Sequence, residues 1–181
     1  MAFAGRVRPK HMLMILVLCM VIGWPLYQLM DLRSGHSVQR DAAKLLHEVA
    51  LFQLEMLVGS LEEAGLAEHA AQLEPLMRQL YAFQYVHGRL EQLYGSDRLG
   101  MLSAPKELLQ VATELQLRAR PLKGAERELF TESARSMAEM IAVYERLVRG
   151  RKGISSQHLE QLRKMDQKLV ERIQSATNGI R

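Results

Sequence analysis

The feature that most constrains this chain is a run of nineteen residues, from Met12 to Met30, that carries no formal charge. A helix rising about 1.5 Å per residue would carry such a run across roughly 28 Å, close to the hydrocarbon thickness of a bilayer. The sequence therefore predicts one transmembrane helix over residues 12–30. We take the following residues as markers of this anchor, with the two amphipathic rings at the headgroup level: Met12, Leu16, Val21, Trp24 and Tyr27.

The charges on either side of this run predict its orientation. The eleven residues before it carry three basic side chains and no acidic one, whereas the first charges after it, Asp31 and Arg33, cancel. By the positive-inside rule, residues 1–11 form a short cytoplasmic N-terminus and residues 31–181 lie outside. We therefore expect a single-pass protein of the cell membrane, and the single-anchor layout suggests a bacterial envelope.

Two alternatives remain for the same segment. A cleaved signal peptide also begins with basic residues, but this apolar run is long for one and no small-residue cleavage site follows it. Lipid attachment at Cys19 is also conceivable, but Leu16-Val17-Leu18 places a bulky leucine where a small residue is usual. Because Cys19 is the one cysteine of the chain, neither an intramolecular disulfide nor a cysteine-based zinc site can form.

Beyond the run, apolar residues recur at helical spacing, beginning with a helix predicted over residues 37–63 and closed by Gly65 as a C-terminal glycine. Spacings of three and four residues define an apolar stripe of Ala42, Leu45, Val49, Phe52 and Met56. Five further residues widen this stripe: Leu46, Ala50, Leu54, Leu57 and Leu61. We expect the whole apolar face to pack within a bundle.

Four more helices are predicted, over residues 66–94, 105–119, 125–149 and 155–176. Pro75 indicates that the first of them begins near Glu74 or is kinked there, and Ser103 is expected to cap the second with its hydroxyl. Alternating spacings of three and four mark one seam of Leu73, Leu76, Leu80, Phe83, His87, Leu90 and Tyr94. They mark another of Phe130, Ala134, Met137, Ile141, Tyr144 and Val148.

These patterns predict an all-α fold. We expect the transmembrane helix, a linker over residues 31–36, and an antiparallel bundle over residues 37–177 with four main helices and one short helix. The spacing of 3.5 residues favours left-handed, coiled-coil-like packing. Residues 31–117 hold seven basic and twelve acidic residues, whereas residues 118–181 hold fourteen basic and eight acidic, so the two halves should attract each other.

The motifs of common enzyme and metal sites are missing from the sequence. No histidine has a glutamate three residues before it, as di-iron bundles require, and neither a nucleophile elbow nor a glycine-rich phosphate loop occurs. We therefore expect no enzyme, no cofactor and no metal.

His87 is the candidate polar site between helices, because it interrupts an apolar seam. It is interpreted either as a pH-sensitive or ligand-contacting group, or as a core-edge histidine bonded to backbone or to Gln84. The nearby Tyr81, Phe83, Tyr85 and Tyr94 either line a small pocket or fill the core.

A second candidate site is the basic patch of Arg146, Arg149, Arg151 and Lys152. It suits an acidic protein surface, an anionic polymer or lipid headgroups, unless it is simply a solvated loop. The expected side of the membrane and the lack of stacking aromatics argue against nucleic acid.

The anchor, the helical seams and the missing chemistry together predict a scaffold or accessory subunit of an envelope complex that acts through protein–protein interaction. Its expected partners are membrane lipid and another membrane or envelope protein, or a second copy in a homo-oligomer. The alternative is an extracytoplasmic bundle that senses a small-molecule ligand and signals through a membrane partner.

Overall fold

The computed structural model describes residues 42–96, 98–148 and 153–180. Within these ranges, no helix is both long and apolar enough to cross a membrane. The predicted span 12–30, its flanking N-terminus and most of the linker lie outside the described residues. The same holds for each anchor residue, namely Met12, Leu16, Val21, Trp24 and Tyr27.

All regular elements in the described part of the chain are helices, as the sequence predicts. Residues 42–66 are helical and come first. After them follow the 3-10 turn η1 (Ala70–Leu73), α2 (Glu74–Tyr94), α3 (Ala104–Arg118), α4 (Gly124–Glu145) and α5 (Ser156–Ile180). The ends of α3, α4 and α5 lie within a few residues of the predicted positions, whereas the predicted start of the first helix at residue 37 lies outside the described residues. Of the two alternatives for the next helix, a start near Glu74 is correct, because Pro75 fits the first turn of α2.

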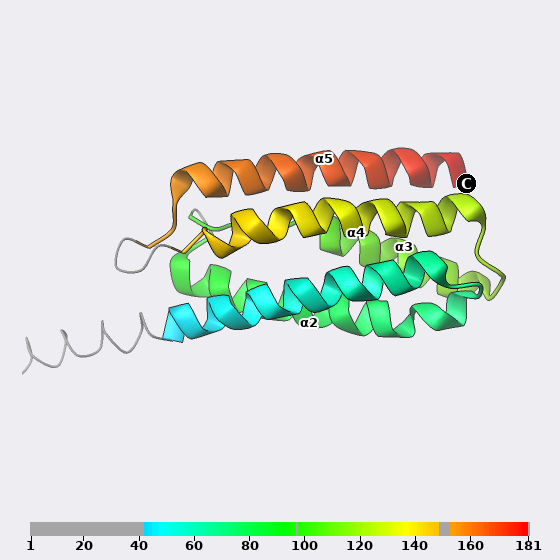
Figure 1. Ribbon diagram of the computed structural model, residues 1–181, viewed down its shortest axis with the longest axis horizontal. Helices are drawn as coiled ribbons and strands as arrows, with labels where there is room; N and C mark the ends of the chain where they lie inside the picture. Colours follow the sequence, from blue (N-terminus) through cyan, green and yellow to red (C-terminus); the bar gives the residue numbers. More distant parts are fainter. Residues whose placement is uncertain (1–41, 97, 149–152, 181) are drawn as a thin grey trace, which may run out of the picture. The chain divides into compact units, whose positions relative to one another are not determined.

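Successive helices run in opposite directions (Figure 1), and the contacts between them close into a ring. The helix 42–66 contacts α2 through Gln53, which accepts hydrogen bonds from Gln79, and α4 through His47, which bonds the carbonyl oxygen of Tyr144. On the other side, α2 packs on α3, α3 on α5 and α5 on α4. The predicted short helix is thus a full member of the bundle.

The core is mainly aliphatic and includes a few rings. Leu73, Leu76, Leu80, Phe83 and Leu90 of the first predicted seam are at most 1% exposed, and His87 lies among them. Phe130, Ala134, Met137 and Tyr144 of the second seam are at most 2% exposed. Both seams therefore face the interior, as predicted.

The expectation for the helix 42–66 is wrong in one respect. Leu54, Leu57 and Leu61, which only widen the predicted stripe, are at most 1% exposed and form its core face. By contrast, the predicted stripe lies largely in solvent, with Phe52 56% exposed and Met56 48% exposed. The reason is geometric, because α2 and α4 contact the helix on the flanks of its leucine row and leave the opposite face uncovered.

Two helix-end residues act differently from prediction. Gly65 does not end its helix, which continues through residue 66; a Cβ there would overlap the Oγ1 of Thr131, so this glycine permits close approach to α4. Ser103 does not cap α3 with its hydroxyl. Instead, the carboxylate of Asp166 on α5 accepts the N–H groups of Ser103 and Ala104 at 2.8 and 2.9 Å.

Candidate interaction surface

The predicted basic patch is described at one position. Arg146 directly follows α4 and is exposed. Arg149, Arg151 and Lys152 lie outside the described residues, so the structure does not show whether the four side chains converge.

His87 lies in the interior, where α2 meets α4 and the loop before α3, and is 1% exposed. Its Nε2 lies 3.1 Å from the carbonyl oxygen of Gly100, which can only accept, so Nε2 carries the proton. In the neutral ring Nδ1 then accepts, and the hydroxyl of Tyr144 donates to it at 2.8 Å. Both ring nitrogens are therefore satisfied by Gly100 and Tyr144, not by Gln84, and the neutral imidazole fits its surroundings.

A second histidine completes this buried cluster, and sequence reasoning missed it. The ring of His47 stacks on that of Tyr144 with 5.4 Å between centroids, and its Nε2 donates to the Tyr144 carbonyl oxygen at 2.8 Å. Burial lowers the pKa of both His47 and His87 below the ordinary value of 6.5. The hydrogen bond that each histidine makes to a backbone carbonyl oxygen opposes this shift. For His47, the nearby charges of Glu48 and Glu145 oppose it as well. Burial also raises the pKa of Tyr144 above 10.0. The cluster ties three helices together through neutral groups.

The aromatic residues of α2 do not gather at one site. Phe83 is buried against His87 and Tyr144. Tyr81 and Tyr85 are 61% and 64% exposed, and the hydroxyl of Tyr85 accepts a hydrogen bond from Arg89. Because these side chains point to opposite sides of the helix, this segment supports packing and not a pocket.

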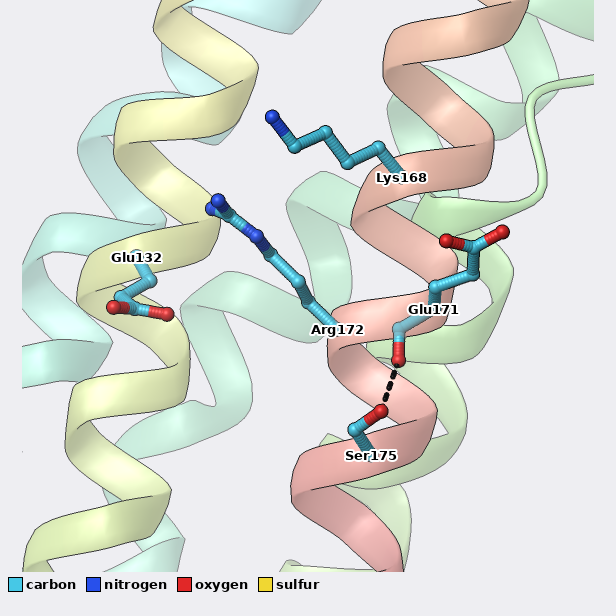
Figure 2. A pocket seen from close by; sticks show the side chains of 5 residues that line it. All are labelled: Glu132, Lys168, Glu171, Arg172 and Ser175. Atoms are coloured by element: carbon cyan, nitrogen blue, oxygen red, sulfur yellow. Dashed lines mark hydrogen bonds between the residues drawn. The ribbon is translucent and has the colours of Figure 1, made fainter.

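A shallow groove of about 550 Å³ runs between α4 and α5 (Figure 2). Arg172 reaches across it toward α4, which contributes Glu132, whereas Glu171 points away and Ser175 donates to the Glu171 carbonyl oxygen at 2.8 Å. Lys168 also lines the groove. With two cations and two carboxylates in an open site, the groove selects no particular charge on a ligand. Nor do the described residues contain a group of three or more His, Cys, Asp or Glu side chains placed to hold a metal ion.

The helix 42–66 presents the most distinctive surface. Leu45, Val49, Phe52 and Met56 are 63%, 38%, 56% and 48% exposed, and at spacings of four, three and four they lie in one line along its outer face. We call these four residues the apolar stripe. Scattered exposed apolar residues are common in soluble domains, but a continuous row on one helix marks a surface suited to another apolar surface.

Glutamates follow one side of the apolar stripe. Glu48, Glu55 and Glu62 are exposed and stand seven residues apart, so they lie in a row beside it; we call them the acidic edge. Lys44 approaches Glu48 at 3.6 Å, but both side chains are largely in solvent. Glu55 and Glu62 form no ion pair with any described residue. This repeat of seven residues is visible in the sequence alone.

Comparison with known proteins adds no family. No family model matches the chain, and neither the curated proteins nor the solved structures show a significant similarity to it.

Proposed function

We propose that the chain is a single-pass membrane protein whose extracytoplasmic helical bundle acts as a scaffold or accessory subunit of an envelope complex. In this proposal residues 1–11 are cytoplasmic, residues 12–30 span the membrane and the remainder lies outside. The bundle works by binding another membrane or envelope protein, and catalysis plays no part.

The observation that carries the proposal is the apolar stripe. It belongs to the first described helix, and Leu45 follows the predicted span by fifteen residues. A chain of that length reaches at most about 50 Å even when fully extended, so the stripe would stay near the membrane surface. Confinement raises the effective concentration of the stripe for a partner held in the same membrane.

The ligand-sensing alternative receives less support from the geometry. Sites for small molecules are usually concave and mostly apolar, with a few convergent polar groups. The groove between α4 and α5 is open and lined by charged side chains. His87 and Tyr144, two buried polar side chains of the core, bond to each other, and His87 also bonds the carbonyl oxygen of Gly100. The geometry therefore favours a protein partner.

The first test concerns the anchor. We expect the full chain to sediment with membranes and to resist alkaline carbonate washing, because a transmembrane helix is not removed by pH or salt. Deletion of residues 1–30 should release the bundle into the soluble fraction. A full chain that washes off the membrane would contradict the anchor.

The second test concerns the surface. A photo-crosslinking amino acid at Phe52 should capture a discrete partner in intact cells. The same group at Glu139, an exposed position on α4, is the matched control. Equal labelling from both positions, or no adduct from Phe52, would count against a scaffold that uses the apolar stripe.

A further inference from the structure

The apolar stripe has the register of a coiled-coil seam. If Val49 and Met56 occupy heptad positions a, then Leu45 and Phe52 occupy positions d. Every g position of the helix then carries an acid, since these are Glu48, Glu55 and Glu62, and Asp41 continues the series in the sequence. The bundle does not use this seam, because its core row is Leu54, Leu57 and Leu61. The helix therefore has one face for its own fold and a second, heptad-patterned face in solvent.

The opposite side of the seam is uncharged and partly covered. Its e positions are Leu46, Gln53 and Ser60, all of them half-buried. Gln53 is held against α2, because Gln79 donates to its backbone oxygen at 3.0 Å and to its side-chain oxygen at 2.6 Å. An incoming helix would therefore meet charge on one side of the seam alone, along the acidic edge.

From this register we infer that the apolar stripe binds a partner helix whose own apolar seam is bordered, on the side that meets Glu48, Glu55 and Glu62, by lysine or arginine. The inference rests on the proposed function in taking the stripe as the binding surface, and adds the chemistry of the partner. Flanking charge pairs of opposite sign set partner choice and orientation in coiled coils.

A second copy of the chain fits this face less well. In an antiparallel pair, g positions face each other, so Glu55 would meet its own counterpart and Glu48 would meet Glu62. In a parallel pair, the acidic edge would face the uncharged residues Gln53 and Ser60. The antiparallel pair is therefore repulsive, and the parallel pair has no electrostatic attraction along the acidic edge. A partner helix with a basic border would be attracted to the acidic edge in either orientation.

The stripe is short, so the contact should be weak outside a membrane. From Leu45 to Met56 the helix rises about 17 Å, roughly two heptads. A contact of this size lies below the roughly 1,000 Å² expected of stable interfaces. We therefore expect micromolar binding by the isolated partner helix, which co-localisation in one membrane would strengthen.

The test uses two synthetic helical peptides and the full chain in a non-ionic detergent. Both peptides have leucine and isoleucine in their seams; one has lysine at all e and g positions, and the other has glutamate there. In fluorescence anisotropy, the lysine peptide should bind at least tenfold more tightly than the glutamate peptide. Its affinity should fall as salt rises, because exposed charges are screened.

Variants of the chain separate the seam from its border. Phe52→Ser should weaken binding of the lysine peptide at least tenfold. The triple variant Glu48→Lys, Glu55→Lys and Glu62→Lys should reverse the preference between the peptides. Glu139→Lys on α4 changes the net charge without touching the stripe and should leave binding unchanged. Because all these side chains are exposed, circular dichroism and the urea midpoint should confirm an intact fold.

Several outcomes would overturn the inference. These are equal binding of the two peptides, no binding of either, and a triple variant that keeps its preference for lysine. A chain that forms dimers broken by Phe52→Ser and ignores both peptides would assign the stripe to a second copy. Each outcome is independent of the membrane tests, since purified chain can select the lysine peptide even if fractionation finds no anchor.

Discussion

His87 occupies an interior position that suits one protonation state. Its Nε2 donates to Gly100 and its Nδ1 accepts from Tyr144, so an added proton on Nδ1 would face a hydroxyl that needs that nitrogen as its acceptor. Burial already lowers the pKa of His87. A protonated His87 would be desolvated and would disturb the contact between α2 and α4.

This arrangement predicts that acid weakens the fold before the carboxylates titrate. In the unfolded chain the imidazole titrates near 6.5, whereas in the folded chain its pKa is lower. Between these two values the unfolded chain binds a proton that the folded chain does not, so the free energy of unfolding falls as pH drops below about 6.5. One imidazole contributes a slope of at most about 1.4 kcal/mol per pH unit. His47 adds to the slope in the same direction.

Urea unfolding between about pH 7.5 and pH 5 measures this slope, above the range in which ordinary carboxylates titrate. His87→Gln should reduce the slope, and His69→Gln, at an exposed position, should not. An unchanged slope in the His87 variant would show that His87 is not responsible.

The place of His87 in the core could be predicted, because it continues a regular seam, but its partners could not. Tyr144 lies 57 residues away in the sequence, and its hydroxyl reaches His87 only after α4 has packed on α2. The burial of His47 was harder still to predict from the sequence. This histidine lies beside the leucine row, on a helix that has apolar residues over much of its circumference. Local spacing places a residue on a face but does not specify its long-range hydrogen bonds.

At the scale of elements, the contact of the helix 42–66 with α4 depends on one glycine. At Gly65 a Cβ would overlap the Oγ1 of Thr131, which is itself bonded to the Arg127 carbonyl oxygen at 3.2 Å. At Gly59 of the same helix, a Cβ would meet nothing within 4 Å. The two glycines therefore provide a matched pair for testing close packing against helix propensity.

We predict opposite effects for the two alanine substitutions. Gly65→Ala should lower the free energy of unfolding by about 1–3 kcal/mol, because overpacking outweighs the better helix propensity. Gly59→Ala should raise it by as much as about 1 kcal/mol. Thr131→Ala combined with Gly65→Ala should recover much of the loss, because the overlapping oxygen is removed. Losses of equal size at both glycines in urea unfolding would refute the packing argument.

The helices themselves could be predicted from spacing, but not which part of a wide apolar face packs. Ten apolar residues of the helix 42–66 form two adjoining rows, and both have the periodicity of a buried surface. The neighbouring helices determine which row is buried, because α2 and α4 contact the flanks of the leucine row. The glutamates seven residues apart border the outer row and not the leucine row, but a seam that packs against a partner has such a border too, so this repeat alone does not tell which row the bundle buries.

At the scale of the whole molecule, the ring is closed by contacts between helices distant in sequence. Asp166 of α5 takes the place of a local cap at the start of α3, more than sixty residues earlier. Burial raises the pKa of Asp166, while the two backbone N–H groups oppose that change. One carboxylate thus joins the α4–α5 hairpin to the rest of the bundle. No local pattern could predict this, since Ser103 already looked like a sufficient cap.

Removing this carboxylate should weaken the fold as a unit. Asp166→Ala leaves the N–H groups of Ser103 and Ala104 without their acceptor, and should lower the free energy of unfolding by about 1–3 kcal/mol. Hydrogen exchange should accelerate at those two amides in particular. Ser103→Ala is the control and should have a small effect, because that hydroxyl does not cap the helix. A larger loss from Ser103→Ala than from Asp166→Ala would contradict this account.

The helix 42–66 and α2, α3, α4 and α5 are the five long helices of the described residues. They alternate in direction, so the end of α5 lies at the opposite end of the bundle from the start of the helix 42–66 (Figure 1). A bundle with an even number of helices would bring both ends to one side. Since α5 has 25 residues and a helix of that length extends about 37 Å, the two ends of α5 lie about that far apart. A fluorescent protein or affinity tag fused after α5 would project from the far end, leaving the start of the apolar stripe accessible for the binding measurements.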